Sequence, residues 1–237
     1  MRDRFIVSCE HGGNEVPDGF RPLFRGHEKL LPTHRGCDLG ILPFAKRLAR
    51  DIDAPLHPAT VTRLLVDLNR SLGSQTLFSE VTRNLPAERR AEILARYYHP
   101  YRRAVTETAG ELIRAGCRVI HLSVHSFTPV FAGTVRDADV GLLYDPARQA
   151  EREFCLRWQR GIERADASLR VRRNYPYRGV SDSLVTSLRT LFAAETYLGI
   201  EIEINQKHPT GSDEGAWEKL QQALVAGLPD RRGAARS

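Results

Sequence analysis

Ionisable and amide side chains gather at or near the ends of four apolar segments, where buried strands are expected to end. In chain order they are Glu10 and His11, then Asp67, Asn69 and Arg70, then His125 and Ser126, and finally Glu201, Glu203 and Asn205. Ligands of open α/β sheets bind beyond the carboxyl ends of the strands, so we expect these side chains to share one site. Imidazole and carboxylate together suit zinc best among the common ions. The pattern therefore predicts a metal centre beside a clamp for a charged substrate.

The elements that must position these residues alternate between apolar strands and amphipathic helices. We predict strands over 5–9, 60–68, 118–124, 139–144, 169–175 and 199–205. Helices are predicted over 41–52, 86–98 with a continuation to 115, 145–163, 182–192 and 212–226, with Asp145 and Asp182 as N-caps. Buried strands alternating with helices favour a three-layer α/β/α fold around a mixed, mostly parallel sheet.

The chain of 237 residues shows no repeat, linker or change of composition, so a single domain is expected over residues 1–228. Residues 229–237 are rich in Gly, Pro, Ser and Arg and predict a flexible tail.

The longest apolar runs fall far short of the ~18 residues of a membrane span, so no membrane association is expected. The net charge of +6 comes from basic residues spread along the chain, which does not favour nucleic-acid binding. Four isolated cysteines with no preceding signal peptide indicate reduced thiols in a cytoplasmic protein.

Five segments carry a resemblance to a known family. They are 7–17 (VSCEHGGNEVP), 34–40 (HRGCDLG), 63–70 (RLLVDLNR), 123–127 (SVHSF) and 199–206 (GIEIEINQ). Together they resemble the N-formylglutamate amidohydrolase family. The resemblance implies a metal-dependent amidohydrolase with a phosphorylase/hydrolase-like fold, distantly similar to zinc carboxypeptidases and to the aspartoacylase and succinylglutamate desuccinylase enzymes. It also implies N-formyl-L-glutamate as substrate, with formate and glutamate as the products, as in histidine catabolism.

The same resemblance implies His11 and His125 as metal ligands. The distant relatives carry a glutamate three residues after the first histidine. Here Asn14 stands at that position and Glu15 follows it. In the pattern of the N-formylglutamate amidohydrolase family, the position of Glu15 need not be acidic, whereas the position of Asp38 carries Asp or His. The resemblance therefore favours Asp38 as the third ligand, with Glu15 as the alternative.

Two ambiguities surround Asp38. It precedes the apolar, helix-periodic run 41–52, so capping that helix is an alternative to binding a metal. His34 is a less favoured third ligand that could instead orient Asp38 from outside the metal centre.

Glu203 is the predicted general base, because it and Glu201 share one face of an otherwise apolar strand. Carboxylates are rarely buried unless they are paired or functional. Arg63 is predicted to stabilise the oxyanion, and Asn69 and Arg70 to bind a substrate carboxylate. The alternative for the arginines is a salt bridge with Asp67.

Arg189 and Tyr177 are predicted to complete the substrate-binding wall, although surface charge on a helix would explain Arg189 equally well.

The leading hypothesis is hydrolysis of a small N-acyl amino acid by a water molecule that zinc activates and Glu203 deprotonates. Two alternatives remain open. One is a hydrolase for another N-acyl amino acid or a peptide-like amide, and the other is a non-catalytic protein that binds metal or carboxylate. The oligomeric state does not follow from the sequence.

Overall fold

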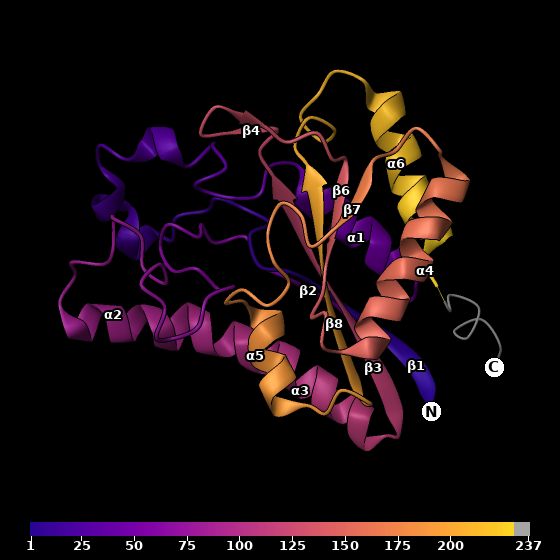
Figure 1. Cartoon of the computed structure of the whole chain (residues 1–237). Helices are drawn as coiled ribbons and strands as arrows, with labels where there is room; N and C mark the ends of the chain where they lie inside the picture. The colour runs from indigo at the N-terminus through magenta and orange to yellow at the C-terminus, as the bar shows by residue number, and fades with distance from the viewer. Residues whose placement is uncertain (230–237) are drawn as a thin grey trace.

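The computed structural model describes residues 1–229 and places a six-stranded sheet at the centre of this part of the chain (Figure 1). The strands are β1 (Arg2–Cys9), β2 (Leu56–Pro58), β3 (Cys117–Phe127), β6 (Val140–Leu143), β7 (Val171–Arg173) and β8 (Tyr197–Asn205). Their order is β2-β1-β3-β8-β6-β7. The first four are parallel, β6 is antiparallel to β8, and β7 is parallel to β6. The prediction of a mixed, mostly parallel sheet is confirmed.

Helices cover both faces of the sheet, which explains why the central strands are apolar on both sides. One face packs against α1 (Ile41–Asp51), α4 (Gln149–Ala165) and α6 (Glu214–Gly227), which share one large core with the strands. The other face packs against α3 (His99–Arg114) and α5 (Leu184–Leu191). Figure 1 shows the first group on the right of the sheet and the second at the lower left. The predicted three-layer arrangement is therefore present.

A second apolar cluster lies beside the sheet and is built from irregular chain between residues 16 and 101. It includes two 3₁₀ helices (Asp18–Phe24 and Glu28–Leu30), helix α2 (Ala87–Ile93) and a π-helical turn (Leu94–Tyr98) that leads into α3. A short hairpin of β4 (Val130–Phe131) and β5 (Thr134–Val135) lies apart from the main sheet. The loops of the cluster flank the carboxyl ends of β1 and β3, so they can deliver polar residues there.

The strand predicted over 60–68 is wrong. Residues 63–65 and 68 lie in turns, and within 60–68 Val61 alone makes a β-bridge, with Glu15. The apolar side chains are buried in the second cluster instead of in the sheet. Side-chain hydroxyls take the place of strand partners, because Ser79 donates to the Leu64 carbonyl and Thr82 donates to that of Leu65 at 3.0 Å.

Two predicted helix starts are also displaced. Helix α4 begins at Gln149, and the Asp145 side chain accepts instead from the Ala147 N–H in the preceding turn at 2.9 Å. The N-cap of α5 is Ser183, whose hydroxyl accepts from the Thr186 N–H. Both aspartates accept hydrogen bonds within or between loops. The local sequence pattern does not distinguish an aspartate in this role from a helix N-cap.

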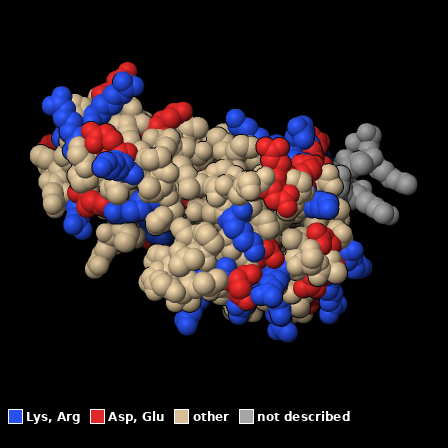
Figure 2. All heavy atoms as spheres, turned by 90° about the horizontal axis from the view of Figure 1, so that it is seen from above, with Lys and Arg blue, Asp and Glu red and all other residues tan. Residues whose placement is uncertain are grey.

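Residues 230–237 of the predicted tail lie outside the described residues. Within residues 1–229, no helix has both the length and the apolar character that crossing a membrane requires. Basic and acidic side chains are interspersed on the face seen in Figure 2, which shows no extended patch of one sign.

Candidate active site and metal centre

A cavity of about 240 Å³ lies at the carboxyl edge of the parallel strands. Strand β1 leads directly into His11, β3 carries His125, and β8 carries Glu201 and Glu203. Parallel pairing of β1 with β3 and of β3 with β8 aligns these positions on one edge. The loop before α1 adds Asp38, whose backbone N–H donates to the His11 carbonyl at 2.9 Å. The topology thus gathers the residues that the sequence pattern singled out.

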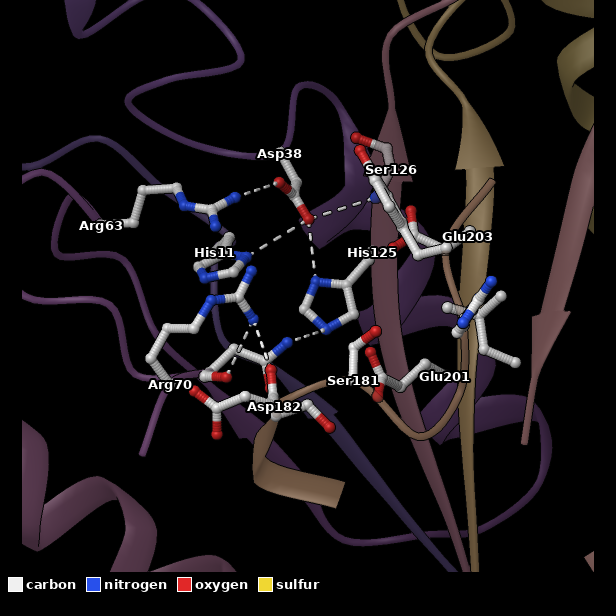
Figure 3. Close-up of a pocket in the computed structure, with 15 residues that line it drawn as sticks. His11, Asp38, Arg63, Arg70, His125, Ser126, Ser181, Asp182, Glu201 and Glu203 are labelled. Carbon is white, nitrogen blue, oxygen red and sulfur yellow. Dashed lines mark hydrogen bonds and ion pairs between the residues drawn. The ribbon is translucent and has the colours of Figure 1, made fainter. Parts of the chain in front are cut away.

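Three buried residues form a candidate metal centre. His11, Asp38 and His125 each present one potential ligand atom, and these atoms lie within 4.8 Å of one another. Both imidazoles turn Nδ1 towards Asp38 Oδ2, at 3.5 Å from His11 and 2.9 Å from His125 (Figure 3). Burial raises the pKa of Asp38, but the two histidines outweigh burial and hold it below its usual range. The carboxylate is therefore held in the charged form that a metal ligand needs.

The outer nitrogens of both histidines contact carboxylates. His11 Nε2 lies 2.7 Å from Asp67 Oδ1, and His125 Nε2 lies 3.1 Å from Glu10 Oε2. Such partners fix the ring orientation and tautomer of metal-ligating histidines. His11 Nδ1 is buried and has no hydrogen-bond partner among the described residues. An orphaned imidazole nitrogen aimed at a carboxylate and a second imidazole fits a divalent metal, and this donor set suits zinc.

The three candidates for the third metal ligand, Asp38, Glu15 and His34, lie in different places. The Asp38 side chain does not cap α1, which begins at Ile41 after Gly40 in a left-handed conformation (φ 70°). Glu15 is exposed and accepts from the Thr60 hydroxyl at 2.8 Å. His34 is exposed as well, and it lines a neighbouring groove. Of these candidates, Asp38 is the one that lies with His11 and His125.

Glu203 lies beside His125, its register partner on β3, and is 5% exposed. Its Oε2 has no hydrogen-bond partner within residues 1–229. Burial raises its pKa to about 8, and the negative charges of Asp38 and Glu201 act in the same direction against the opposing effect of His125. A carboxyl group with a pKa near neutrality can both accept and return a proton, as a general acid–base catalyst must.

Arg63 is engaged with the carboxylates of the site. It donates to Asp67 Oδ2 at 2.6 Å and makes a longer contact of 3.4 Å with Asp38 Oδ1. Burial raises the pKa of Asp67, but Arg63 and then His11 outweigh it and hold this pKa well below its usual range. The salt bridge with Asp67, which was the alternative for this arginine, is present, and Arg63 lines the cavity as well.

The neighbouring Asn69 and Arg70 both line the cavity but make different contacts. Asn69 is buried, accepts from the Leu184 N–H at 2.7 Å through Oδ1, and has Nδ2 at 3.3 Å from His125 Nε2. It therefore connects the metal centre to the start of α5. Arg70 lines the cavity, and its Nη1 donates to the Asp182 carbonyl at 2.7 Å. Its other guanidinium nitrogens make no hydrogen bond within residues 1–229, so they remain available to a carboxylate.

The two residues predicted for the substrate wall are placed differently. Tyr177 lines the cavity at its exposed rim, where its hydroxyl accepts from Arg136 at 3.2 Å. Arg189 is buried outside the cavity, ion-paired with Glu151 at 3.0 Å. It donates to the Gly199 carbonyl at 2.6 Å and to the Gly179 carbonyl. This placement corrects the prediction that Arg189 binds substrate. Helix α5 turns it towards the interior, where it supports the loop before that helix.

Sequence reasoning missed several residues of the site. Glu10 and Asp67 had been seen next to candidate ligands, but not as the partners of His125 and His11. Arg178 and Ser181 line the cavity from a loop without helical or strand periodicity, so no local signal pointed to them. His121, the other buried histidine of β3, is not among the residues that line the cavity and lies between the Ser8 and Tyr197 hydroxyls, at 2.7 Å from each.

A buried carboxyl group with a raised pKa thus lies beside a cluster of two histidines and one carboxylate, at the carboxyl edge of an α/β sheet. Such an arrangement can support hydrolysis. Residues 3–208 match the model of the N-formylglutamate amidohydrolase family, and the chain belongs to this family. The protein is thus a hydrolase of amide bonds, an amidohydrolase acting on N-acyl amino acids. The resemblance drawn from the sequence motifs is confirmed.

Solved structures agree with the fold. Gene product Atu2144 from Agrobacterium tumefaciens is 27% identical, with a TM-score of 0.73 over 93% of this chain and 90% of that chain. N-formylglutamate amidohydrolase from Ralstonia eutropha JMP134 is 21% identical, with a TM-score of 0.62 over 97% of this chain and 93% of that chain. No curated protein matches the sequence.

Proposed function

We propose that the protein is a metal-dependent amidohydrolase that cleaves N-formyl-L-glutamate, or a similar N-acyl amino acid, to the free acid and the amino acid. The observation that carries the proposal is the position of Glu203, a buried carboxyl group without a hydrogen-bond partner on one oxygen, next to the cluster of His11, Asp38 and His125. Family membership supports the substrate class. In this proposal the reaction belongs to histidine catabolism, as the family resemblance implies, and takes place in the cytoplasm, as the isolated cysteines indicate.

His11 and His125 would hold one divalent metal through Nδ1, with Asp38 as the carboxylate ligand. When bound, zinc would polarise the acyl carbonyl and lower the pKa of the attacking water. Asp67 and Glu10 keep the two imidazoles in the ligating orientation from the far side.

Glu203 accepts the proton that the attacking water loses and later returns it to the amide nitrogen, which leaves as an amine. The C–N bond breaks, the acyl carbon gains the water oxygen, and Glu203 is regenerated. Arg63 is the proposed donor to the developing oxyanion through Nη1, whose contact with Asp38 is long at 3.4 Å. Arg70 binds a substrate carboxylate with its remaining N–H groups, and Asn69, which lines the same cavity and contacts His125, takes part in this binding.

One observation favours a larger substrate as the second candidate. A groove of about 560 Å³ adjoins the cavity and shares Arg63 and Arg70 with it. A longer N-acyl group or a peptide-like amide could extend into this groove from the same catalytic residues.

A panel of N-acyl-L-glutamates, with formyl, acetyl and succinyl groups, tests the proposal on protein with a measured metal content. We expect the formyl compound to be hydrolysed best, and activity to disappear with a chelator and return with zinc. Glu203→Gln should retain the metal and lose ~10²–10⁴-fold in kcat, the range for removal of general acid–base catalysis. Glu195→Gln, the same chemical change at an exposed position before β8, is the matched control. Full activity of Glu203→Gln, or activity that survives removal of the metal, would contradict the proposal.

A further inference from the structure

The inner part of the catalytic cavity contains a second carboxylate to which the mechanism gives no task. Glu201 lies two residues before Glu203 on β8, so the two side chains share one face of the strand at a spacing of ~7 Å. It is 7% exposed and lines the cavity. Its register partners are Ser123 on β3 and Leu143 on β6. Figure 3 shows it beside Ser181, on the same side of the strand as Glu203.

Among the described residues, Glu201 shares with Glu203 a lack of polar partners that sets both apart from the other buried carboxylates of this edge. Glu10, Asp38 and Asp67 each contact at least two polar partners. Within residues 1–229, no hydrogen bond or ion pair engages Glu201. A buried carboxylate without a partner is unfavourable, and the cost is recovered only when a donor reaches it. Because this side chain lines the cavity, water can reach it in the free protein, and a bound molecule that displaces this water has to supply the donor in its place.

We propose that Glu201 determines substrate specificity by accepting a hydrogen bond from the substrate side chain, so that the preferred substrates are N-acyl amino acids ending in a carboxamide or an ammonium group. The inference rests on the proposed function, in that it takes the cavity to bind an N-acyl amino acid with its scissile amide at Glu203. It narrows that function, since the γ-carboxylate of N-formylglutamate is then the less favoured side chain.

The geometry matches a side chain of the length of glutamine. When the amide nitrogen of the substrate lies at Glu203, Glu201 is ~7 Å further into the cavity along β8. A carboxylate brought there would face Glu201 in a poorly screened environment, where like charges repel strongly. Arg178 also lines the cavity but is exposed, so it offers a carboxylate only a solvated, screened contact. Buried Glu201 therefore has a larger effect than exposed Arg178 on which substrate side chain is preferred.

The test compares kcat/KM for N-formyl-L-glutamine, N-formyl-L-lysine and N-formyl-L-glutamate. The wild-type protein, Glu201→Gln and the exposed control Glu195→Gln are measured with all three. Wild type and the control should favour a donor-bearing substrate over the glutamate derivative by at least ~10-fold. Glu201→Gln should shift that ratio towards glutamate by ~10- to 100-fold, because its carboxamide can donate to the γ-carboxylate. The ratio of two substrates on one preparation is independent of the folded fraction, so partial misfolding does not obscure the result.

The glutamine and lysine derivatives distinguish a neutral donor from a cationic one, and preference for either supports the inference. A wild-type preference for the glutamate derivative, or a ratio that Glu201→Gln leaves unchanged, overturns it.

Binding by calorimetry to Glu203→Gln, with and without Glu201→Gln, measures the same discrimination when turnover is absent. If Glu201 makes the protein bind the glutamine or lysine derivative more tightly than the glutamate derivative, but the wild type hydrolyses none of them, the result would count against the proposed function alone. Turnover of N-formyl amino acids without discrimination would count against the role of Glu201 alone.

Discussion

The buried carboxyl group of Glu203 should make the stability of the metal-stripped protein depend on pH. Its pKa of about 8 in the fold lies above the ordinary value of 4.5. The unfolded chain therefore releases this proton first as the pH rises, and stability falls between the two values. The contribution is fully present below about pH 4.5 and is lost as the pH passes about 8. Glu203→Gln removes the titrating group and should abolish this loss.

The size of the effect follows from the shift. A difference of 3.5 between the two pKa values corresponds to an upper limit of roughly 5 kcal/mol, at about 1.4 kcal/mol for each tenfold change in proton affinity. Glu203 faces a cavity that water can enter, so we expect ~2–5 kcal/mol. A bound metal would oppose the shift by stabilising the charged carboxylate, which is why the metal is removed first.

Urea unfolding of the wild type and of Glu203→Gln, at several values between about pH 5 and pH 9 with a chelator present, measures the effect. Titrations of groups remote from Glu203 are common to both proteins and cancel in the difference of their unfolding free energies. The variant should gain ~2–5 kcal/mol relative to the wild type from the acidic to the alkaline end. Glu195→Gln should show no such trend. A difference that stays constant across the range would refute the account of Glu203 as a buried carboxyl group with a raised pKa.

Three further predictions concern the metal and the substrate clamp. His11→Ala should lose the bound metal, because the orphaned Nδ1 is removed, and elemental analysis that finds full metal together with full activity would exclude the ligand assignment. Asp67→Asn should weaken metal affinity ~10- to 100-fold in competition with a chelating dye, since His11 Nε2 and Arg63 lose their charged partner; unchanged affinity would show that this contact is not needed. Arg70→Lys should lower kcat/KM for an N-formyl amino acid by on the order of 30- to 10³-fold and leave the matching uncharged amide nearly unchanged; equal losses on both substrates would remove Arg70 from the clamp.

The sequence by itself determined the central strands and the residues at their ends. Burial on both faces requires long apolar runs, and these runs are visible locally in β1, β3 and β8. Parallel strands bring their carboxyl ends to one edge, so His11, His125 and Glu203 could be assigned to a common site before any coordinates were known.

Only the tertiary structure decided which other groups join them. His11 meets Asp67 across 56 residues of chain, and His125 meets Asp38 across 87. Local patterns do not encode such long-range pairs, because the loops that carry the aspartates have no fixed periodicity. The choice of Asp38 over Glu15 depended on which loop folds over the strand ends.

The direction of single side chains depended on packing in the same way. Arg189 has the same place in the helical pattern whether it faces solvent, substrate or the interior, and the docking of α5 against β8 turned it inward to Glu151. The apolar segment over 60–68 has the composition of a strand, yet within residues 1–229 it pairs with no strand of the sheet and makes a single β-bridge, between Val61 and Glu15. It is buried in the second apolar cluster, where hydroxyl groups satisfy its carbonyls. Composition determined that this segment is buried, and the packing of its neighbours determined its backbone conformation.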